Sequence, residues 1–140
     1  MDYSYIIIPI IVAISSQVLK LLTDSIKGNF DLKNLFSAYG GFPSSHTAFA
    51  ISITTLLGLR LGIDSPVFAA ALVFSLIIMR DAVSFRGLLG RQAKLFNQAM
   101  SNLANNSQLP KFEERIGHSA FEVFGGVIYG VVVTYLLSIL

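Results

Sequence analysis

The segment HSAFEVFGGVIYGVVVTYLLSIL, His118–Leu140, carries Glu122 as its single charged side chain in 23 residues. Three further apolar segments precede it, at about Tyr5–Leu22, Ser45–Leu61 and Pro66–Met79. A helix needs about 20 mostly apolar residues to cross the hydrocarbon core of a bilayer. The pattern therefore predicts an all-α integral membrane helical bundle with about four transmembrane helices.

Composition supports the membrane class. Of the 140 residues, 54% are hydrophobic and 13% are charged, whereas a soluble domain has about 25% charged residues. A soluble bundle of buried helices is the alternative, which this composition disfavours. The sequence has no cysteine and two histidines, so we expect no metal site and no cofactor. The net charge of +2 gives no indication of nucleic-acid binding, and we expect one domain over residues 1–140.

The connections between the apolar segments are polar and of unequal length. Thr23–Gly41 joins the first two segments, and Gly62–Pro66 is a tight turn between the second and third. The third segment is short, and Asp81–Leu103 after it has few helix breakers. This stretch either continues the third helix or forms an amphipathic helix at the membrane interface. We expect residues 105–110 to form a loop.

The stretch Gly40-Gly41-Phe42-Pro43-Ser44-Ser45-His46 opens the second apolar segment. Ser44 and Ser45 can cap that helix, whose first N–H groups have no internal partner. Such a cup of donors suits an anion such as phosphate, and His46 beside it could transfer a proton near neutral pH. The alternative is a capped helix with an interfacial histidine.

His118 and Glu122 lie four residues apart, so on a helix they share one face. A carboxylate that binds one imidazole nitrogen fixes the tautomer and leaves the other nitrogen free as a nucleophile or base. Ionisable residues inside a membrane segment are costly and are functional candidates by default. The alternative is a structural pair of polar groups.

Polar residues also follow the third segment at three- and four-residue steps, which would place them on one stripe of a helix. The stripe consists of Arg80, Ser84, Gly87, Arg91 and Lys94. Asp81 and Arg86 lie off that line. We expect Arg86 and Arg91 to contact phosphate, because arginine binds phosphate oxygens in a planar, bidentate way. We expect Arg80 and Lys94 to be snorkelling side chains of a positive-inside belt.

Together these motifs resemble the type 2 phosphatidic acid phosphatases, whose superfamily includes the vanadium-dependent haloperoxidases. The chain is most similar to the small divergent branch of that family, over roughly residues 5–135. Three blocks carry the resemblance in order, namely Gly40–Thr47, Asp81-Ala82 with Arg86, and Ile116–Val123. The resemblance implies a metal-independent phosphatase in a bacterial cell membrane, crossing it several times.

The resemblance also implies residue roles. His118 matches the histidine that attacks phosphorus and forms a phosphohistidine, and His46 matches the histidine that protonates the leaving alcohol. Glu122 stands where the superfamily has aspartate. Lys20 and Lys27 have the spacing of a family lysine and arginine. We expect phosphate ligands among Lys20, Ser44, Ser45, Arg86, Arg91 and Arg115, with Asp81 as a further polar site candidate.

The sequence thus predicts a lipid phosphate phosphatase that hydrolyses a phosphomonoester. Phosphatidylglycerol phosphate, phosphatidic acid and isoprenyl phosphates all remain open as substrates. The alternatives are a non-catalytic membrane binding or scaffold protein, and a lipid or phosphate transporter, with the same fold. Gly126 and Gly130 lie one helical turn apart and predict a tight helix contact. We expect a homodimer, the alternative being that these glycines pack within one subunit.

Membrane orientation is a first testable expectation. With four spans, the first and third connections lie on one side, which then carries both histidines and most basic residues. The positive-inside tendency places that side in the cytoplasm and both termini outside. A C-terminal reporter that folds only in the cytoplasm should therefore be inactive, and an active fusion would contradict this orientation.

Overall fold

The computed structural model describes residues 3–26, 41–103, 111–114 and 116–140, and all the regular structure in these ranges is helical. The predicted all-α fold is confirmed. Lys27, Arg115 and the loop expected at 105–110 lie outside the described residues. The elements are α1 (Ser4–Ile26), α3 (Ser45–Leu61), α4 (Pro66–Arg80), the π-helical turn η1 (Asp81–Phe85), α5 (Arg86–Leu103) and α6 (Ala120–Ser138).

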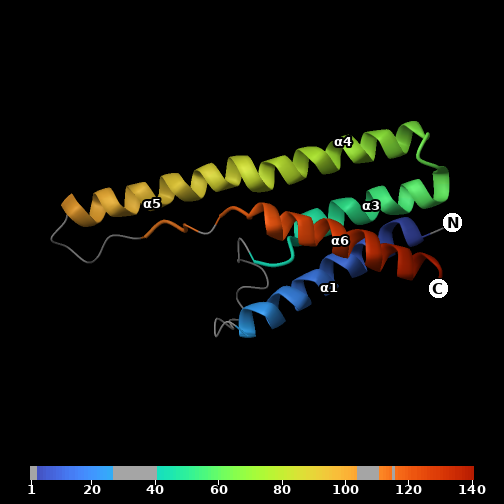
Figure 1. Ribbon diagram of the computed structural model, residues 1–140, viewed down its shortest axis with the longest axis horizontal. Coiled ribbons are helices and arrows are strands. Elements are labelled where there is room, and N and C mark those ends of the chain that lie inside the picture. The colour runs from blue at the N-terminus through green and yellow to red at the C-terminus, as the bar shows by residue number, and fades with distance from the viewer. Residues whose placement is uncertain (1–2, 27–40, 104–110, 115) are drawn as a thin grey trace.

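Helix α3 is the centre of the bundle and packs against α1, α4 and α6. Helix α6 runs parallel to α3, whereas α1 and α4 run in the opposite direction (Figure 1). The start of α3 and the start of α6 therefore lie at one end of the bundle, and the two chain termini lie at the other (Figure 1).

Two glycines allow α6 to approach α3 closely. A Cβ placed on Gly126 would lie 2.6 Å from the Ser44 carbonyl oxygen, and one on Gly130 would lie 2.7 Å from the Ala48 carbonyl oxygen. Gly126 pairs with Ser44 and Gly130 pairs with Ala48, so the two helices stay in the same register over one turn. The tight contact predicted for these glycines is confirmed within a single chain, and the homodimer stays a prediction.

The interior combines small apolar and hydroxyl side chains. Ile8 and Val12 of α1 and Ala48 and Leu56 of α3 form the buried apolar cluster. Hydroxyl groups fasten α4 to α3, because in lipid no hydrophobic force drives helices together and packing and hydrogen bonds take over. The link is a pair of buried hydroxyls, Thr54 on α3 and Ser75 on α4, whose oxygens lie 2.8 Å apart.

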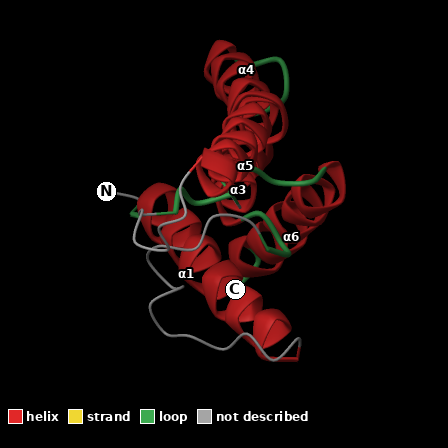
Figure 2. Ribbon diagram, turned by 90° about the vertical axis from the view of Figure 1, so that its left-hand side faces the viewer, coloured by secondary structure: helices red, strands yellow, loops and turns green. Residues whose placement is uncertain are grey.

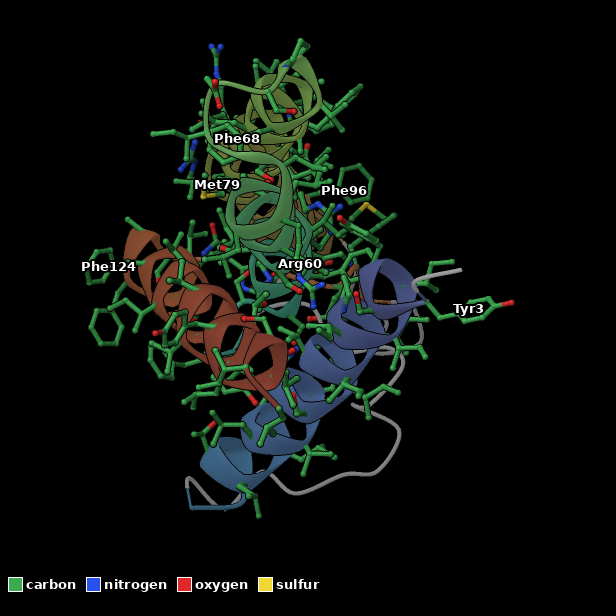
Figure 3. All side chains as sticks on the ribbon, turned by 90° about the vertical axis from the view of Figure 1, so that its right-hand side faces the viewer. Tyr3, Arg60, Phe68, Met79, Phe96 and Phe124 are labelled. Atoms are coloured by element: carbon green, nitrogen blue, oxygen red, sulfur yellow. The ribbon has the colours of Figure 1, made fainter. Side chains whose placement is uncertain are left out.

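Within the described residues, three helices are long and apolar enough to cross a membrane, over Ser4–Thr23, Pro66–Ser101 and Ala120–Ser138. Helix α3 has 17 residues and lies among them; at 1.5 Å per residue it is about 26 Å long. This is roughly consistent with the prediction of about four spans. Large apolar side chains cover the outside, and Figure 3 shows Tyr3 and Phe124 pointing away from the bundle.

Helices α4 and α5 join through η1 into one long helix (Figure 1). Its 36-residue apolar part, Pro66–Ser101, measures about 54 Å at 1.5 Å per residue, well beyond the ~30 Å hydrocarbon core. Asp81–Leu103 thus continues the third helix, and its position at the membrane interface stays a prediction. Figure 2, seen along this helix, shows α1 and α6 on one side of it.

The α3–α6 contact makes a testable prediction. Gly130→Leu should lower the free energy of unfolding by roughly 1–3 kcal/mol, because the new side chain meets backbone that cannot move aside. Thermal melting of the purified protein in detergent measures this. Ala69→Leu on the exposed side of α4 is the matched control, and equal melting temperatures for the two variants would contradict the contact.

Candidate active site

His118 and Glu122 form the centre of the site. The Nδ1 atom of His118 lies 3.0 Å from the Glu122 carboxylate, and the imidazole is buried. The pair does not lie on one helix face as predicted, because α6 begins only at Ala120, after Ser119 as N-cap. Ser119 and Glu122 form a capping box, and the carboxylate that accepts the Ser119 N–H at 3.1 Å also binds the imidazole. The contact is thus correct and its helical explanation is wrong.

The backbone before α6 is fixed by η1 and the start of α5. The His118 N–H donates to the Ala82 carbonyl oxygen at 3.1 Å. A Cβ on Gly117 would lie 2.6 Å from the Gly87 nitrogen, so glycine permits the chain to pass directly over the long helix. His118 is therefore held between α6 and η1.

The loop before α3 covers the end of α1. Gly41 has φ +103, in the region that favours glycine, and a Cβ there would lie 2.7 Å from the Lys20 Cε atom. Lys20 is almost completely buried beneath this loop. Thr23 donates its hydroxyl to the Phe42 carbonyl oxygen at 2.8 Å, which ties α1 to the loop.

The same loop is tied to α6. The Phe42 ring packs on Gly125 and stacks on Phe121 with 5.1 Å between ring centroids. The Ser44 N–H donates to the Glu122 carbonyl oxygen at 2.9 Å. The first turns of α3 and α6 are consequently joined beside the His118–Glu122 pair.

The predicted serine cap needs a correction. Ser44 is the N-cap of α3, but its side chain accepts no bond from a helix N–H, and its Oγ accepts the Thr47 hydroxyl at 3.0 Å instead. Ser45 is the first helical residue, and its buried Oγ has no hydrogen-bond partner among the described residues. The Ser44 side chain therefore does not cap the first N–H groups of α3, and such groups at a helix start suit an anion.

His46 lies in the first turn of α3 and is exposed, unlike its neighbours on the buried side of the helix. The start of α3 is hydrogen-bonded to α6 through Ser44 and Glu122, His118 is hydrogen-bonded to Ala82 of η1, and Gly41 packs on Lys20 of α1. The structure thus brings α1, α3, η1 and α6 together around one polar region.

Asp81 and Arg86 are paired by the π turn. Arg86 Nε donates to the Asp81 carboxylate at 2.8 Å, and the Arg86 N–H donates to the Asp81 carbonyl oxygen. A π turn places residues five apart above one another, and such turns are frequent at functional sites. The extra residue in the turn also breaks the polar stripe predicted for an uninterrupted helix.

A cavity of about 290 Å³ lies against His118 on the side of α5. Its cationic walls are Arg91 and Lys94, and its acidic wall is Glu114. Further along α5, the Asn97 amide forms hydrogen bonds with both the N–H and the carbonyl oxygen of Phe112, each at 2.9 Å. Among the described residues, no group of three histidine or acidic side chains is arranged to hold a metal ion.

The comparisons with known proteins fit this picture. A family model described as "Divergent PAP2 family" matches residues 1–133. The chain belongs to the divergent PAP2 family. It is also 30% identical over 138 residues to the uncharacterized membrane protein YuiD of Bacillus subtilis (strain 168), covering 89% of this chain and 87% of that protein. No solved structure matches.

With its apolar helices, this divergent PAP2 protein is an integral multi-pass membrane protein. Of the predicted site residues, His118, Glu122, His46, Lys20, Ser44, Ser45, Asp81 and Arg86 gather around the two helix starts. Arg91 lies on the α5 side of His118, in the wall of the cavity that both residues line.

Sequence analysis missed three contributors. Lys94 lines the cavity with Arg91 and is not merely a belt residue. The Thr47 hydroxyl donates to the Ser44 Oγ atom. Asn97 accepts the Phe112 N–H and so binds the segment before α6 to α5. One available signal was Gly90, where an added Cβ would lie 2.5 Å from the Glu114 carbonyl oxygen, because a glycine within a helix can mark a face that another segment approaches.

The Asn97 contact yields a prediction for this divergent PAP2 protein. Asn97→Ala should release residues 111–114 from α5, because it removes the partners of the Phe112 backbone. Hydrogen exchange at Phe112 should then accelerate on the order of tenfold, as expected for one lost hydrogen bond of about 1 kcal/mol. Gln98→Ala, on the neighbouring exposed position, should leave exchange unchanged. Unchanged exchange in Asn97→Ala would contradict this anchoring role.

Proposed function

We propose that this protein is a lipid phosphate phosphatase that hydrolyses a phosphomonoester through a phosphohistidine. The observation that carries the proposal is the buried His118 imidazole, whose Nδ1 is held 3.0 Å from Glu122. With Nδ1 bound to a carboxylate, the proton resides on Nδ1 and the lone pair on Nε2 is free to attack.

In the first step, Nε2 of His118 attacks phosphorus and a P–N bond forms while the P–O bond to the alcohol breaks. The departing oxygen needs a proton, which His46 supplies as its imidazolium. Glu122 stabilises the positive charge that develops on the His118 ring. His46 is the candidate donor because it is exposed in the first turn of α3, whose start is hydrogen-bonded to α6 beside His118.

In the second step, water attacks phosphorus and the P–N bond breaks, which releases inorganic phosphate and restores His118. His46, now neutral, accepts the proton that the attacking water loses. The same two histidines thus act in both half-reactions, and each ends the cycle in the protonation state in which it began.

The remaining requirement is positive groups beside the negatively charged phosphoryl oxygens, because phosphoryl transfer depends mainly on positioning and charge stabilisation. Lys20 and Arg86 both lie close enough to act on His46. The N–H groups of the first turn of α3, which the Ser44 side chain does not cap, add further donors. Arg91 and Lys94 extend the positive surface on the other side of His118.

The site lies at one end of a bundle whose outside is apolar, so a substrate anchored in the membrane can reach it by lateral diffusion. This favours a lipid phosphate over a soluble one. The proposal leaves the lipid open among phosphatidic acid, phosphatidylglycerol phosphate and isoprenyl phosphates.

Leaving-group dependence tests the two histidine roles. His118→Ala should abolish phosphate release from a lipid phosphate, and His46→Ala should slow it by about 10²- to 10⁴-fold, the usual contribution of general acid catalysis. An aryl phosphate needs less acid help, so it should partly rescue His46→Ala and not His118→Ala. Metal-free phosphate release by the purified protein is the measurement, and equal rescue of both variants would refute the assignment.

Glu122 provides a separate prediction. Glu122→Gln should slow turnover on the order of 10²-fold or more, because the neutral amide no longer fixes the tautomer or stabilises the imidazolium. Glutamine is also accepted at this position of a capping box, so α6 should keep its start and the melting temperature should change little. Glu122→Asp, which retains the carboxylate, should recover part of the rate. Full activity in Glu122→Gln would reduce the pair to a structural contact.

A further inference from the structure

An apolar groove of about 350 Å³ lies between α3 and α4. On α3 it is lined by Phe49, Ile53 and Leu57, and on α4 by Ala70, Phe74 and Ile78, among others. Nearly all of its wall is hydrocarbon, and it takes no part in the hydrolytic steps described above.

The groove leads to the candidate active site. Phe49, Ile53 and Leu57 follow one another at four-residue steps, and His46 precedes Phe49 by three residues, so His46 heads the same face of α3. On the opposite wall, Ile78 is three residues before Asp81, the partner of Arg86. Both walls therefore end at polar residues of the site.

Hydrogen bonds hold the groove at a fixed width. The Thr54 and Ser75 hydroxyl oxygens lie 2.8 Å apart, and the Ala50 carbonyl oxygen is 3.1 Å from each of them. These contacts fasten α3 to α4 at the floor. Alanine at position 70 leaves the space above the floor open, where a larger side chain would fill it.

The length of the groove matches half of a bilayer. Its α4 wall runs from Val67 to Ile78, a rise of about 16 Å at 1.5 Å per residue. One leaflet contributes about half of the ~30 Å hydrocarbon core. A chain that lies in the groove with its head at His46 would therefore span one leaflet and keep its polar head at the membrane surface.

We propose that the groove binds one hydrocarbon chain of the lipid whose phosphate group occupies the site at His46 and His118. The inference rests on the proposed function for the identity of that head group. Because the surrounding lipid tails are as apolar as the groove, the chain gains no hydrophobic free energy by entering it. The groove therefore contributes packing and orientation. By fixing the hydrocarbon chain, the groove aligns the phosphate with the attacking imidazole. Such alignment of the reacting groups raises the rate of phosphoryl transfer.

Photo-crosslinking tests the groove without requiring turnover. Full-length His118→Ala protein in lipid nanodiscs is exposed to a long-chain phosphatidic acid with a diazirine in one acyl chain, and labelled peptides are mapped by mass spectrometry. Labels should concentrate on α3 and α4 residues of the groove. The same lipid without its phosphate should label these residues several-fold less, because it lacks the polar anchor. Equal labelling by the two lipids, or labels spread over α1 and α6, would overturn the proposal.

A matched pair of variants sharpens the result. Ala70→Trp fills the groove and should reduce groove labelling several-fold, whereas Ala69→Trp on the neighbouring exposed position outside the groove should not. If the Ala70→Trp protein has a lower melting temperature than the Ala69→Trp control, the smaller Ala70→Leu is used, and it should also reduce groove labelling. Equal groove labelling in the position 70 and position 69 variants would refute the groove as a binding site. Groove labelling as expected, together with no phosphate release by the unmutated protein, would sustain the groove and refute the phosphatase proposal.

Discussion

The hydrogen bond from the Ser44 N–H to the Glu122 carbonyl oxygen, at 2.9 Å, joins the starts of α3 and α6. It is possible because Gly126 and Gly130 let the two helices pack backbone against backbone in parallel. Two parallel helices in contact present both N-termini at the same end, where unpaired N–H groups and the helix dipoles favour negative charge. His46 and His118 stand at these two starts, so the polar site follows from the packing.

The π turn η1 is the second element on which the site depends. By inserting one residue into the long helix, it pairs Asp81 with Arg86 across five positions. It also presents the Ala82 carbonyl to the His118 N–H. Without the insertion, the residues after Arg80 would continue an uninterrupted stripe, and these two contacts would be lost together. The turn thus connects the α4–α5 helix to the His118–Glu122 pair.

The surrounding lipid explains the choice of residues throughout the bundle. Because apolar side chains gain nothing by leaving lipid for one another, association depends on close packing and on hydrogen bonds. Glycine supplies the closeness between α3 and α6, and the Thr54–Ser75 pair supplies the hydrogen bonds between α3 and α4. A groove lies on the α4 side of α3, and close backbone packing lies on the α6 side.

The sequence by itself determined the membrane class, the positions of the helices and the proximity of His118 to Glu122. Each of these depends on local information, namely apolar length, helix breakers and a four-residue spacing that survives even though His118 precedes the helix. Only the tertiary structure decided that His46, Lys20 and Arg86 share one polar region with His118. It also decided that Thr47 donates its hydroxyl to the Ser44 Oγ atom, and that Arg91 lines a cavity against His118. These relations depend on helix pairing, register and the one-residue shift of a π turn, which no pattern in a single segment specifies.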